Sequence, residues 1–169
     1  MLKKFNMNPI LMEDIEATIT NSTSMLNQFK NRTILITGIT GLVIRILTLT
    51  LLVANEQLNL NLKIIGVARN LDKVKAQYAD LVENDNFEVL IQDIRDEITT
   101  QQSVDFIFHG AAVTDSKSLR DFPLEAFDTQ VKGTANILKF ATKTKATVVY
   151  LSSMEIYGQP FVDGKATEK

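Results

Sequence analysis

Residues 34–44 read Ile34-Leu35-Ile36-Thr37-Gly38-Ile39-Thr40-Gly41-Leu42-Val43-Ile44, an apolar run that leads into two spaced glycines and then a helical pattern. This order predicts a strand, a tight turn and a helix in direct succession. Glycine permits the turn and a close backbone approach, and the free N–H groups and positive end of a helix attract an anion. We interpret the segment as a pyrophosphate-binding turn, against the alternative of a plain strand-turn-helix corner.

Ile44 stands where this glycine pattern has its third glycine, which lets the helix and the strand approach closely. A branched side chain at that position is expected to crowd the contact and to weaken dinucleotide binding. The substitution Ile44→Gly is therefore predicted to tighten that binding.

Composition limits the classes of protein to which the chain can belong. Its 169 residues, 45% of them hydrophobic, predict one sizeable core and a single domain. A net charge of −2 with mixed signs gives no basic face for nucleic acid, and one histidine without cysteine argues against a metal site. The start has no apolar region typical of a secretory signal, and the longest apolar stretch, 42–53, is too short to span a bilayer. We expect a cytoplasmic protein without a membrane partner.

Short apolar runs alternate with helical patterns along the chain. Strands are predicted at 33–37, 62–68, 87–92, 105–109 and 147–151. Helices are predicted at 42–54, 72–83 and 123–142. Because the strands are apolar on both faces, helices should cover both sides of a parallel sheet. The alternation predicts an α/β fold with a doubly wound parallel sheet and right-handed crossovers.

Two helical patterns predict what their helices bury. In the helix at 123–142, apolar residues recur every three or four positions, and we expect this stripe to be core. Its members are Leu124, Phe127, Val131, Ala135 and Leu138. Before the first strand, Leu11, Ile15 and Ile19 recur every four positions, which predicts a short amphipathic helix packed on the outside.

Polar residues follow several strands, at the edge where ligands of such sheets bind. Arg69 follows the second strand, and with Lys73 nearby it can meet a 2′-phosphate or form a solvated basic turn; both interpretations stay open. His109 ends the fourth strand. Because no carboxylate partner is indicated, we interpret it as a hydrogen-bonded strand-end residue rather than a base. Ser152, Ser153 and Glu155 follow the fifth strand, either at the same rim or in a surface turn.

Five segments occur in the order and spacing of one known family. They are Thr37-Gly38-Ile39-Thr40-Gly41, Asp93-Ile94-Arg95-Asp96, His109-Gly110-Ala111-Ala112, Val131-Lys132-Gly133-Thr134-Ala135-Asn136-Ile137-Leu138 and Leu151-Ser152-Ser153-Met154-Glu155-Ile156-Tyr157-Gly158. With them the chain resembles the extended short-chain dehydrogenase/reductase family, specifically its nucleotide-sugar epimerases and dehydratases. The resemblance implies an NAD(P)-binding Rossmann domain over 31–158, a helical extension over 1–30 and a polar loop over 159–169.

The resemblance also implies roles for individual residues. The cofactor-binding positions would be Gly38, Thr40, Gly41, Leu42, Val43, Arg69, Asp93, Ile94, Ala111, Ala112, Val113 and Gln130. Among these, Asp93 would approach the adenine, and Gln130 stands where many members have asparagine. Ser153 would bind the reacting sugar oxygen, and Glu155 matches a glutamate of the dehydratase and decarboxylase members. The implied cofactor is NAD, with NADP as the alternative, the substrate is a nucleotide sugar, and the full-length enzyme would be a homodimer.

One part of the family pattern is absent. Hydride chemistry in the family uses a tyrosine four positions before a lysine, and none of Tyr78, Tyr150 and Tyr157 is followed by lysine at that spacing. In the family this pair begins shortly beyond residue 169, so the chain looks like the front half of a longer enzyme. The parent would act through a transient 4-keto sugar by dehydration, epimerisation or decarboxylation, and the chain alone should be inactive. The alternatives are an NADP-dependent carbonyl reductase and a non-catalytic dinucleotide-binding module.

Overall fold

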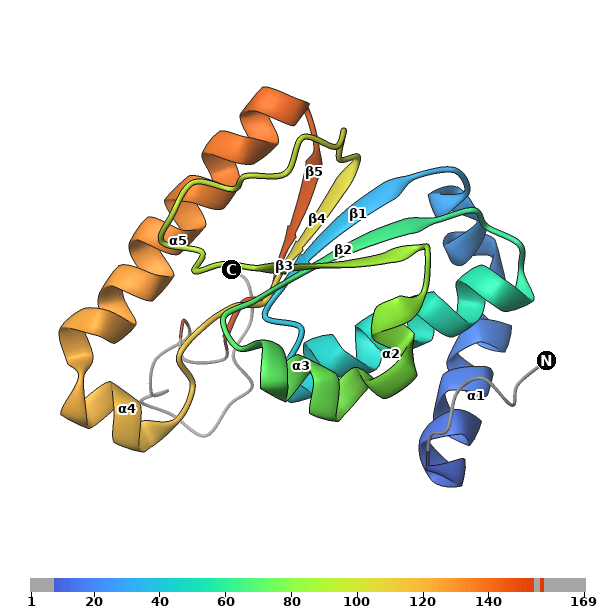
Figure 1. Ribbon diagram of the computed structural model, residues 1–169, viewed down its shortest axis with the longest axis horizontal. Coiled ribbons are helices and arrows are strands. Elements are labelled where there is room, and N and C mark those ends of the chain that lie inside the picture. The colour runs from blue at the N-terminus through green and yellow to red at the C-terminus, as the bar shows by residue number, and fades with distance from the viewer. Residues whose placement is uncertain (1–7, 154–155, 157–169) are drawn as a thin grey trace, which may run out of the picture.

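All five predicted strands form, and they pair in parallel in a single sheet. The computed structural model describes residues 8–153 and residue 156. The sheet has the order β3-β2-β1-β4-β5 (Figure 1). Its strands are β1 (Thr33–Thr37), β2 (Lys63–Ala68), β3 (Phe87–Ile91), β4 (Phe106–His109) and β5 (Thr147–Tyr150). Because β1 lies between β2 and β4, the strand order reverses at β1. In such sheets a ligand binds at the carboxyl ends of the strands beside this reversal.

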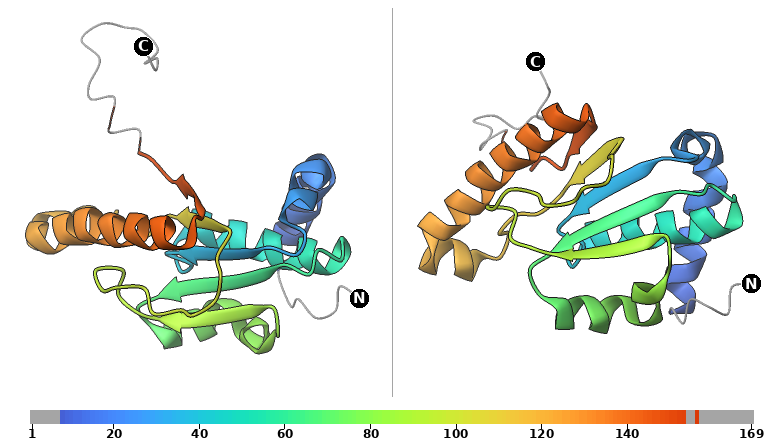
Figure 2. Two further views of the ribbon diagram at one scale, coloured as in Figure 1. Left: turned by 90° about the horizontal axis from the view of Figure 1, so that it is seen from above. Right: turned by 45° about the horizontal axis from the view of Figure 1, so that its top comes forward.

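Helices cover both faces of the sheet. On one side lie α2 (Leu42–Gln57), α3 (Leu71–Tyr78) and the short helix η3 (Ala79–Glu83), and on the other lies α5 (Pro123–Thr144) (Figures 1 and 2). Neighbouring β1 residues alternate between the two cores, since Ile34 and Ile36 pack with the α2 side and Leu35 with the α5 side. This arrangement confirms the predicted Rossmann-like fold. Among the described residues, no helix has the length and apolar character needed to cross a membrane.

The predicted N-terminal helix is present as α1 (Pro9–Leu26), and η2 (Asn27–Phe29) follows it. The side chain of Asn8 accepts a hydrogen bond from the Ile10 N–H and so caps the start of α1. Ile15, Ile19 and Leu26 are buried in the core that includes α2. The helix therefore packs on the outside of α2, as its spacing predicts (Figure 1).

The expected core stripe of α5 is wrong. Leu124 is 82% exposed, Phe127 is 61% exposed, and Val131 and Leu138 are exposed by about half. A different face of the helix meets the sheet, and it consists of Ala126, Thr129, Gly133, Ile137, Phe140 and Ala141. The small residues explain the choice, because a Cβ on Gly133 would lie 2.5 Å from Ile94 Cδ1. The helix approaches closely only on that face.

Two further expectations differ from the structure. β3 and β5 are the edge strands of the described sheet, and β5 is mostly exposed rather than apolar and covered on both faces. A short helix, α4 (Ser116–Asp121), precedes α5 and was not predicted from the sequence. Its cap is Asp115, whose carboxylate accepts a hydrogen bond from the Ser118 N–H at 2.8 Å.

Candidate functional site

The register of the sheet brings the sequence motifs to one edge. Thr37, the last residue of β1, pairs with Val67 of β2 and with His109 of β4. The turn after β1 therefore lies between the carboxyl ends of β2 and β4, and α2 leads away from it (Figure 1). This is the edge at which ligands of open parallel sheets bind.

The turn itself depends on Gly38, whose φ is +76°. Its N–H donates to the Val67 carbonyl at 3.1 Å, and the Gly41 N–H donates back to the Gly38 carbonyl at 2.9 Å. A Cβ on Gly38 would lie 2.9 Å from the Cα and N of Ala111. Both the backbone conformation and the neighbouring chain thus require glycine here.

Buried contacts fix the side of the turn that faces the core. Ile39 is fully buried and packs against Gly66 of β2. A Cβ on Gly66 would lie 2.8 Å from Cδ1 of Ile39. The hydroxyl of Tyr78 donates to the Ile39 carbonyl at 2.6 Å, and burial raises the pKa of this tyrosine to about 12. Gln77 donates to the Thr40 carbonyl at 3.3 Å. The end of α3 therefore fixes the position of the turn.

The side of the turn that faces away from the core is open. Among the described residues, the only non-neighbouring atom within 4 Å of a Cβ placed on Gly41 is the Gly38 carbonyl oxygen. Leu42 and Val43 are exposed, and Gly41 caps α2 without a side-chain hydrogen bond. The first N–H groups of this 16-residue helix thus lack a side-chain cap at its positive end. Backbone N–H groups at the start of a helix are the groups that bind a phosphate, so the pyrophosphate interpretation of this turn stays a prediction consistent with its geometry.

Ile44 does not crowd the turn in the way expected from the sequence. It is 2% exposed and packs against Gly110, which follows β4 and has no side chain to oppose it. A third glycine on α2 would leave room between the helix and the sheet. In this chain Gly110, directly after β4, leaves that room instead, and the Ile44 side chain fills it.

His109 is a buried, hydrogen-bonded residue, as interpreted from the sequence. Its Nδ1 lies 2.7 Å from the hydroxyl of Thr37, and its Nε2 lies 3.2 Å from the hydroxyl of Thr134. The Thr37 hydroxyl also accepts the Ala111 N–H at 3.2 Å. Burial lowers the pKa of His109 and favours the neutral ring, in which one nitrogen donates and the other accepts. The ring therefore joins β4 to β1 and α5, and the Thr37 hydroxyl also binds the segment after β4.

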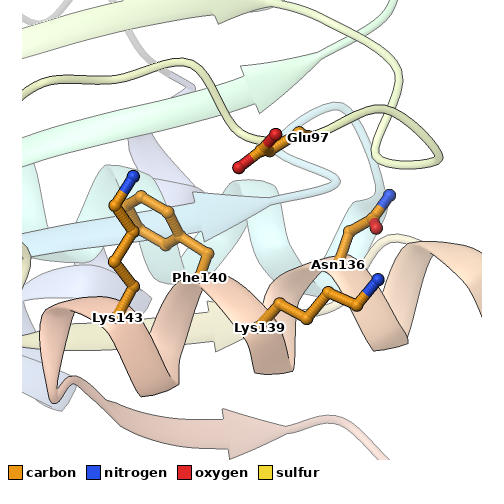
Figure 3. A pocket seen from close by; sticks show the side chains of 5 residues that line it. All are labelled: Glu97, Asn136, Lys139, Phe140 and Lys143. Atoms are coloured by element: carbon orange, nitrogen blue, oxygen red, sulfur yellow. The ribbon is translucent and has the colours of Figure 1, made fainter.

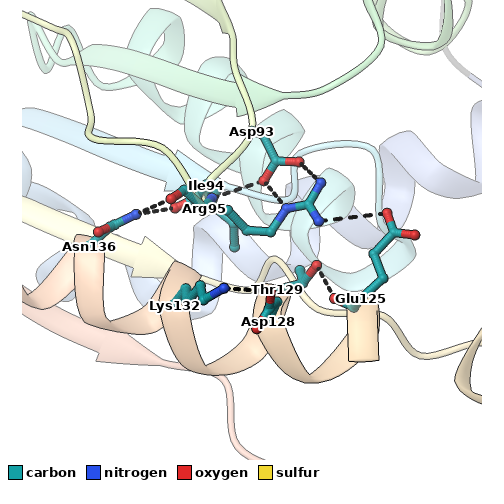
Figure 4. Close-up of polar contacts among 8 residues, drawn as sticks. All are labelled: Asp93, Ile94, Arg95, Glu125, Asp128, Thr129, Lys132 and Asn136. Atoms are coloured by element: carbon teal, nitrogen blue, oxygen red, sulfur yellow. Dashed lines mark hydrogen bonds and ion pairs between the residues drawn. The ribbon is translucent and has the colours of Figure 1, made fainter. Parts of the chain in front are cut away.

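Asp93 and Arg95 form a pair at the end of β3 (Figure 4). The guanidinium donates to both carboxylate oxygens of Asp93, at 3.1 and 2.7 Å, and Arg95 also lies 3.8 Å from Glu125 of α5. The guanidinium of Arg95 is the main reason that the pKa of Asp93 is lowered, and Arg69 contributes to it. Asn136 donates to the Ile94 and Arg95 carbonyls at 3.1 and 2.6 Å. The loop after β3 is thus tied to α5.

Most of the remaining predicted residues follow strands at the same edge, and Gln130 belongs to α5. Arg69, Ala112, Gln130 and Ser153 are exposed, while Thr40, Ala111 and Val113 are half-buried. The geometry brings Gly38 against Ala111, whereas Asp93 joins Arg95 and α5. Glu155 lies outside the described residues. Sequence reasoning missed Tyr78, Thr134 and the partnership of Ile44 with Gly110.

A pocket of about 280 Å³ lies between the loop after β3 and α5 (Figure 3). Its lining consists of Glu97 from the loop after β3 and Asn136, Lys139, Phe140 and Lys143 from α5. None of the residues predicted to bind the cofactor lines it. The open turn at the sheet edge, rather than this pocket, is therefore the candidate site.

Comparison with known proteins points to one group. The sequence model of the NAD dependent epimerase/dehydratase family matches residues 34–169. The chain is 30% identical over 98 residues to a UDP-N-acetyl-alpha-D-glucosaminuronate decarboxylase of Bacillus cytotoxicus, covering 56% of this chain and 30% of that protein. It is also 30% identical over 129 residues to a UDP-glucose 4-epimerase of Rickettsia canadensis, covering 74% and 37%. The chain thus spans about a third of the length of these curated relatives.

Solved structures share the fold. The dTDP-glucose 4,6-dehydratase DesIV of Streptomyces venezuelae, crystallised with NAD, superposes with a TM-score of 0.64 at 23% identity. The match covers 79% of this chain and 42% of that one.

Proposed function

The chain belongs to the NAD-dependent epimerase/dehydratase family, and on that premise we propose that it is the dinucleotide-binding part of an enzyme acting on nucleotide sugars. The observation that carries the proposal is the turn from Gly38 to Gly41. It lies at the carboxyl edge of the sheet, its backbone is open, and the start of α2 follows it without a side-chain cap.

In this proposal different residues at the carboxyl ends of the strands bind different parts of the cofactor. Gly38, Thr40, Gly41, Leu42 and Val43 would hold the pyrophosphate of NAD through backbone N–H groups. The adenosine would lie toward β2 and β3, near Arg69, Asp93 and Ile94. The other half would lie along Ala111, Ala112 and Val113, with Gln130 of α5 nearby. NAD is the proposed cofactor because the family is defined by it.

Bound NAD supplies a reversible acceptor for the hydride at C4 of the sugar. In this proposal the Ser153 hydroxyl, exposed after β5, orients the C4 oxygen. Glu155 would remove the proton at C5, which the neighbouring carbonyl makes acidic, and this favours dehydration over epimerisation alone. Because the chain has no tyrosine four positions before a lysine, we propose that it binds the cofactor without turning over a sugar by itself.

The exposed face of α5 supports the proposed homodimer. Leu124, Phe127, Val131 and Leu138 are large apolar residues that the sheet does not cover. Such a continuous apolar stripe on a soluble fold is typical of an interaction surface. A second copy of the protein is the proposed occupant, and replacing Phe127 and Val131 by serine should shift the sedimentation coefficient toward that of a monomer.

Titration calorimetry with NAD tests the cofactor proposal. The chain should bind NAD, and Gly38→Ala should abolish measurable binding, because the added Cβ meets the backbone of Ala111. The matched control is Leu26→Ala at the end of α1, which removes a buried side chain away from the turn and should leave NAD affinity unchanged. If the unaltered chain binds no NAD, the proposal fails.

A further inference from the structure

We propose that Ile44 and Gly110 are a reciprocal pair that positions the phosphate-binding turn relative to the chain segment after β4. The inference rests on the proposed dinucleotide function, and it assigns a positioning role to a residue at which the glycine pattern is broken. Ile44 belongs to the first turn of α2 and Gly110 follows directly after β4, 66 positions later in the sequence.

The contact between the two residues leaves room for only one side chain. A Cβ on Gly110 would lie 2.4 Å from Cγ1 and 2.5 Å from Cδ1 of Ile44. The next atom, Cδ2 of Leu151, lies at 3.5 Å, an ordinary contact. Among the glycines of the described chain only Gly38 has a positive φ, so the backbone at Gly110 would accept a side chain. Among the described residues, Ile44 alone excludes a side chain at Gly110.

A second contact lies immediately beside the first. The backbone of Ala111 lies against Gly38, where a Cβ would come within 2.9 Å, and its N–H donates to the Thr37 hydroxyl. The segment Gly110-Ala111 is thus held at two points, by the turn and by the first turn of α2. Because a β-branched isoleucine in a helix is confined to few rotamers, Ile44 is a stiff spacer rather than a flexible filler.

This spacing matters for a dinucleotide more than for a mononucleotide. In a doubly wound sheet the pyrophosphate lies at the turn and the two nucleotide halves lie on either side of it. NAD would contact both the turn and the segment after β4, whereas AMP can occupy the β1–β3 side alone. A shift of Gly110-Ala111 relative to α2 should therefore lower the affinity for NAD and leave the affinity for AMP almost unchanged.

A double-mutant cycle in the complete chain tests the pair, with NAD affinity, AMP affinity and urea unfolding as measurements. Gly110→Ala should weaken NAD about tenfold and AMP by less than about twofold. Ile44→Ala removes both atoms that the new Cβ would meet, so the double variant should regain NAD affinity to within about threefold of the original chain. The loss of unfolding free energy caused by Gly110→Ala should likewise be smaller in the Ile44→Ala background than in the original chain.

The control cycle combines Gly110→Ala with Leu52→Ala, a buried residue two helical turns farther along α2. Here the effects should simply add. Additive effects in the Ile44 cycle would overturn the pairing. Coupled stability with an NAD affinity that Gly110→Ala leaves unchanged would overturn the positioning role while keeping the packing. Absence of NAD binding in the unaltered chain would overturn the proposed function and the positioning role together, and the stability cycle would still decide the pairing.

Discussion

The Thr37 hydroxyl and His109 Nδ1 lie 2.7 Å apart and join two neighbouring strands at the candidate site. Burial lowers the pKa of His109, so the folded protein prefers the neutral ring. As pH falls below about 6.5, the unfolded chain takes up the proton first, and folding stability should decline through the lowered folded pKa. Urea unfolding between pH 8 and 5 should show this loss, and His109→Gln should flatten that part of the profile. A profile unchanged by the substitution would contradict the assignment.

Tyr78 should titrate unusually late. Its folded pKa is about 12, so the unfolded chain loses the phenolic proton first and stability should fall as pH rises from about 10 toward 12. Tyr78→Phe leaves the buried Ile39 carbonyl without this donor and should lower the free energy of unfolding by about 1–3 kcal/mol. Ultraviolet difference titration and urea unfolding measure the two effects. Tyr150→Phe, at an exposed position, is the control.

Arg95 should hold the Asp93 carboxyl in its ionised form. Arg95→Met removes the paired guanidinium, and the pKa of Asp93 should return toward its ordinary value of 3.8 in a carboxyl NMR titration. The stabilisation that this pair provides is present above that pH and is lost as pH falls through the lowered folded pKa. Because both side chains are partly exposed, the change in stability near neutral pH should be small. Arg120→Met, which removes another ion pair, should leave the pKa of Asp93 unchanged.

Arg69 should distinguish the two cofactors. The side chain is exposed after β2, on the side where the adenosine ribose is proposed to lie. If it meets a 2′-phosphate, Arg69→Ala should weaken NADP by about tenfold or more and leave NAD nearly unchanged. Calorimetry with both cofactors measures the difference, and Lys73→Ala tests its neighbour in the same way. Equal losses, or none, would assign Arg69 to a solvated turn.

The sequence predicted the strands well because each is a short apolar run that ends at a glycine or polar residue. β1 has the predicted bounds, and each of the other strands differs from its predicted bounds by one residue. The single-sequence pattern failed for α5 because that helix has two apolar faces. Periodicity favours the larger side chains of Leu124 and Phe127, whereas close packing against the sheet selects Ala126 and Gly133.

The candidate site was predicted where its residues are near in sequence and missed where they are far apart. The turn from Gly38 to Gly41 follows from local glycine spacing. The contact of Ile44 with Gly110 has no local signal, since only the pairing of β1 with β4 brings these residues together. The threonine partners of His109 were hidden for the same reason, as Thr134 comes from α5.

The order of the strands also bears on how the chain folds. β1 meets β2 after about 30 residues, but it meets β4 only after more than twice that length, and the Thr37–His109 contact spans 72 residues. Closing the shorter loop costs less chain entropy, so the β1-β2-β3 half of the sheet should assemble before β4 and β5 join it. A weakening at Thr37 or His109 would then mainly accelerate unfolding and leave the refolding rate almost unchanged.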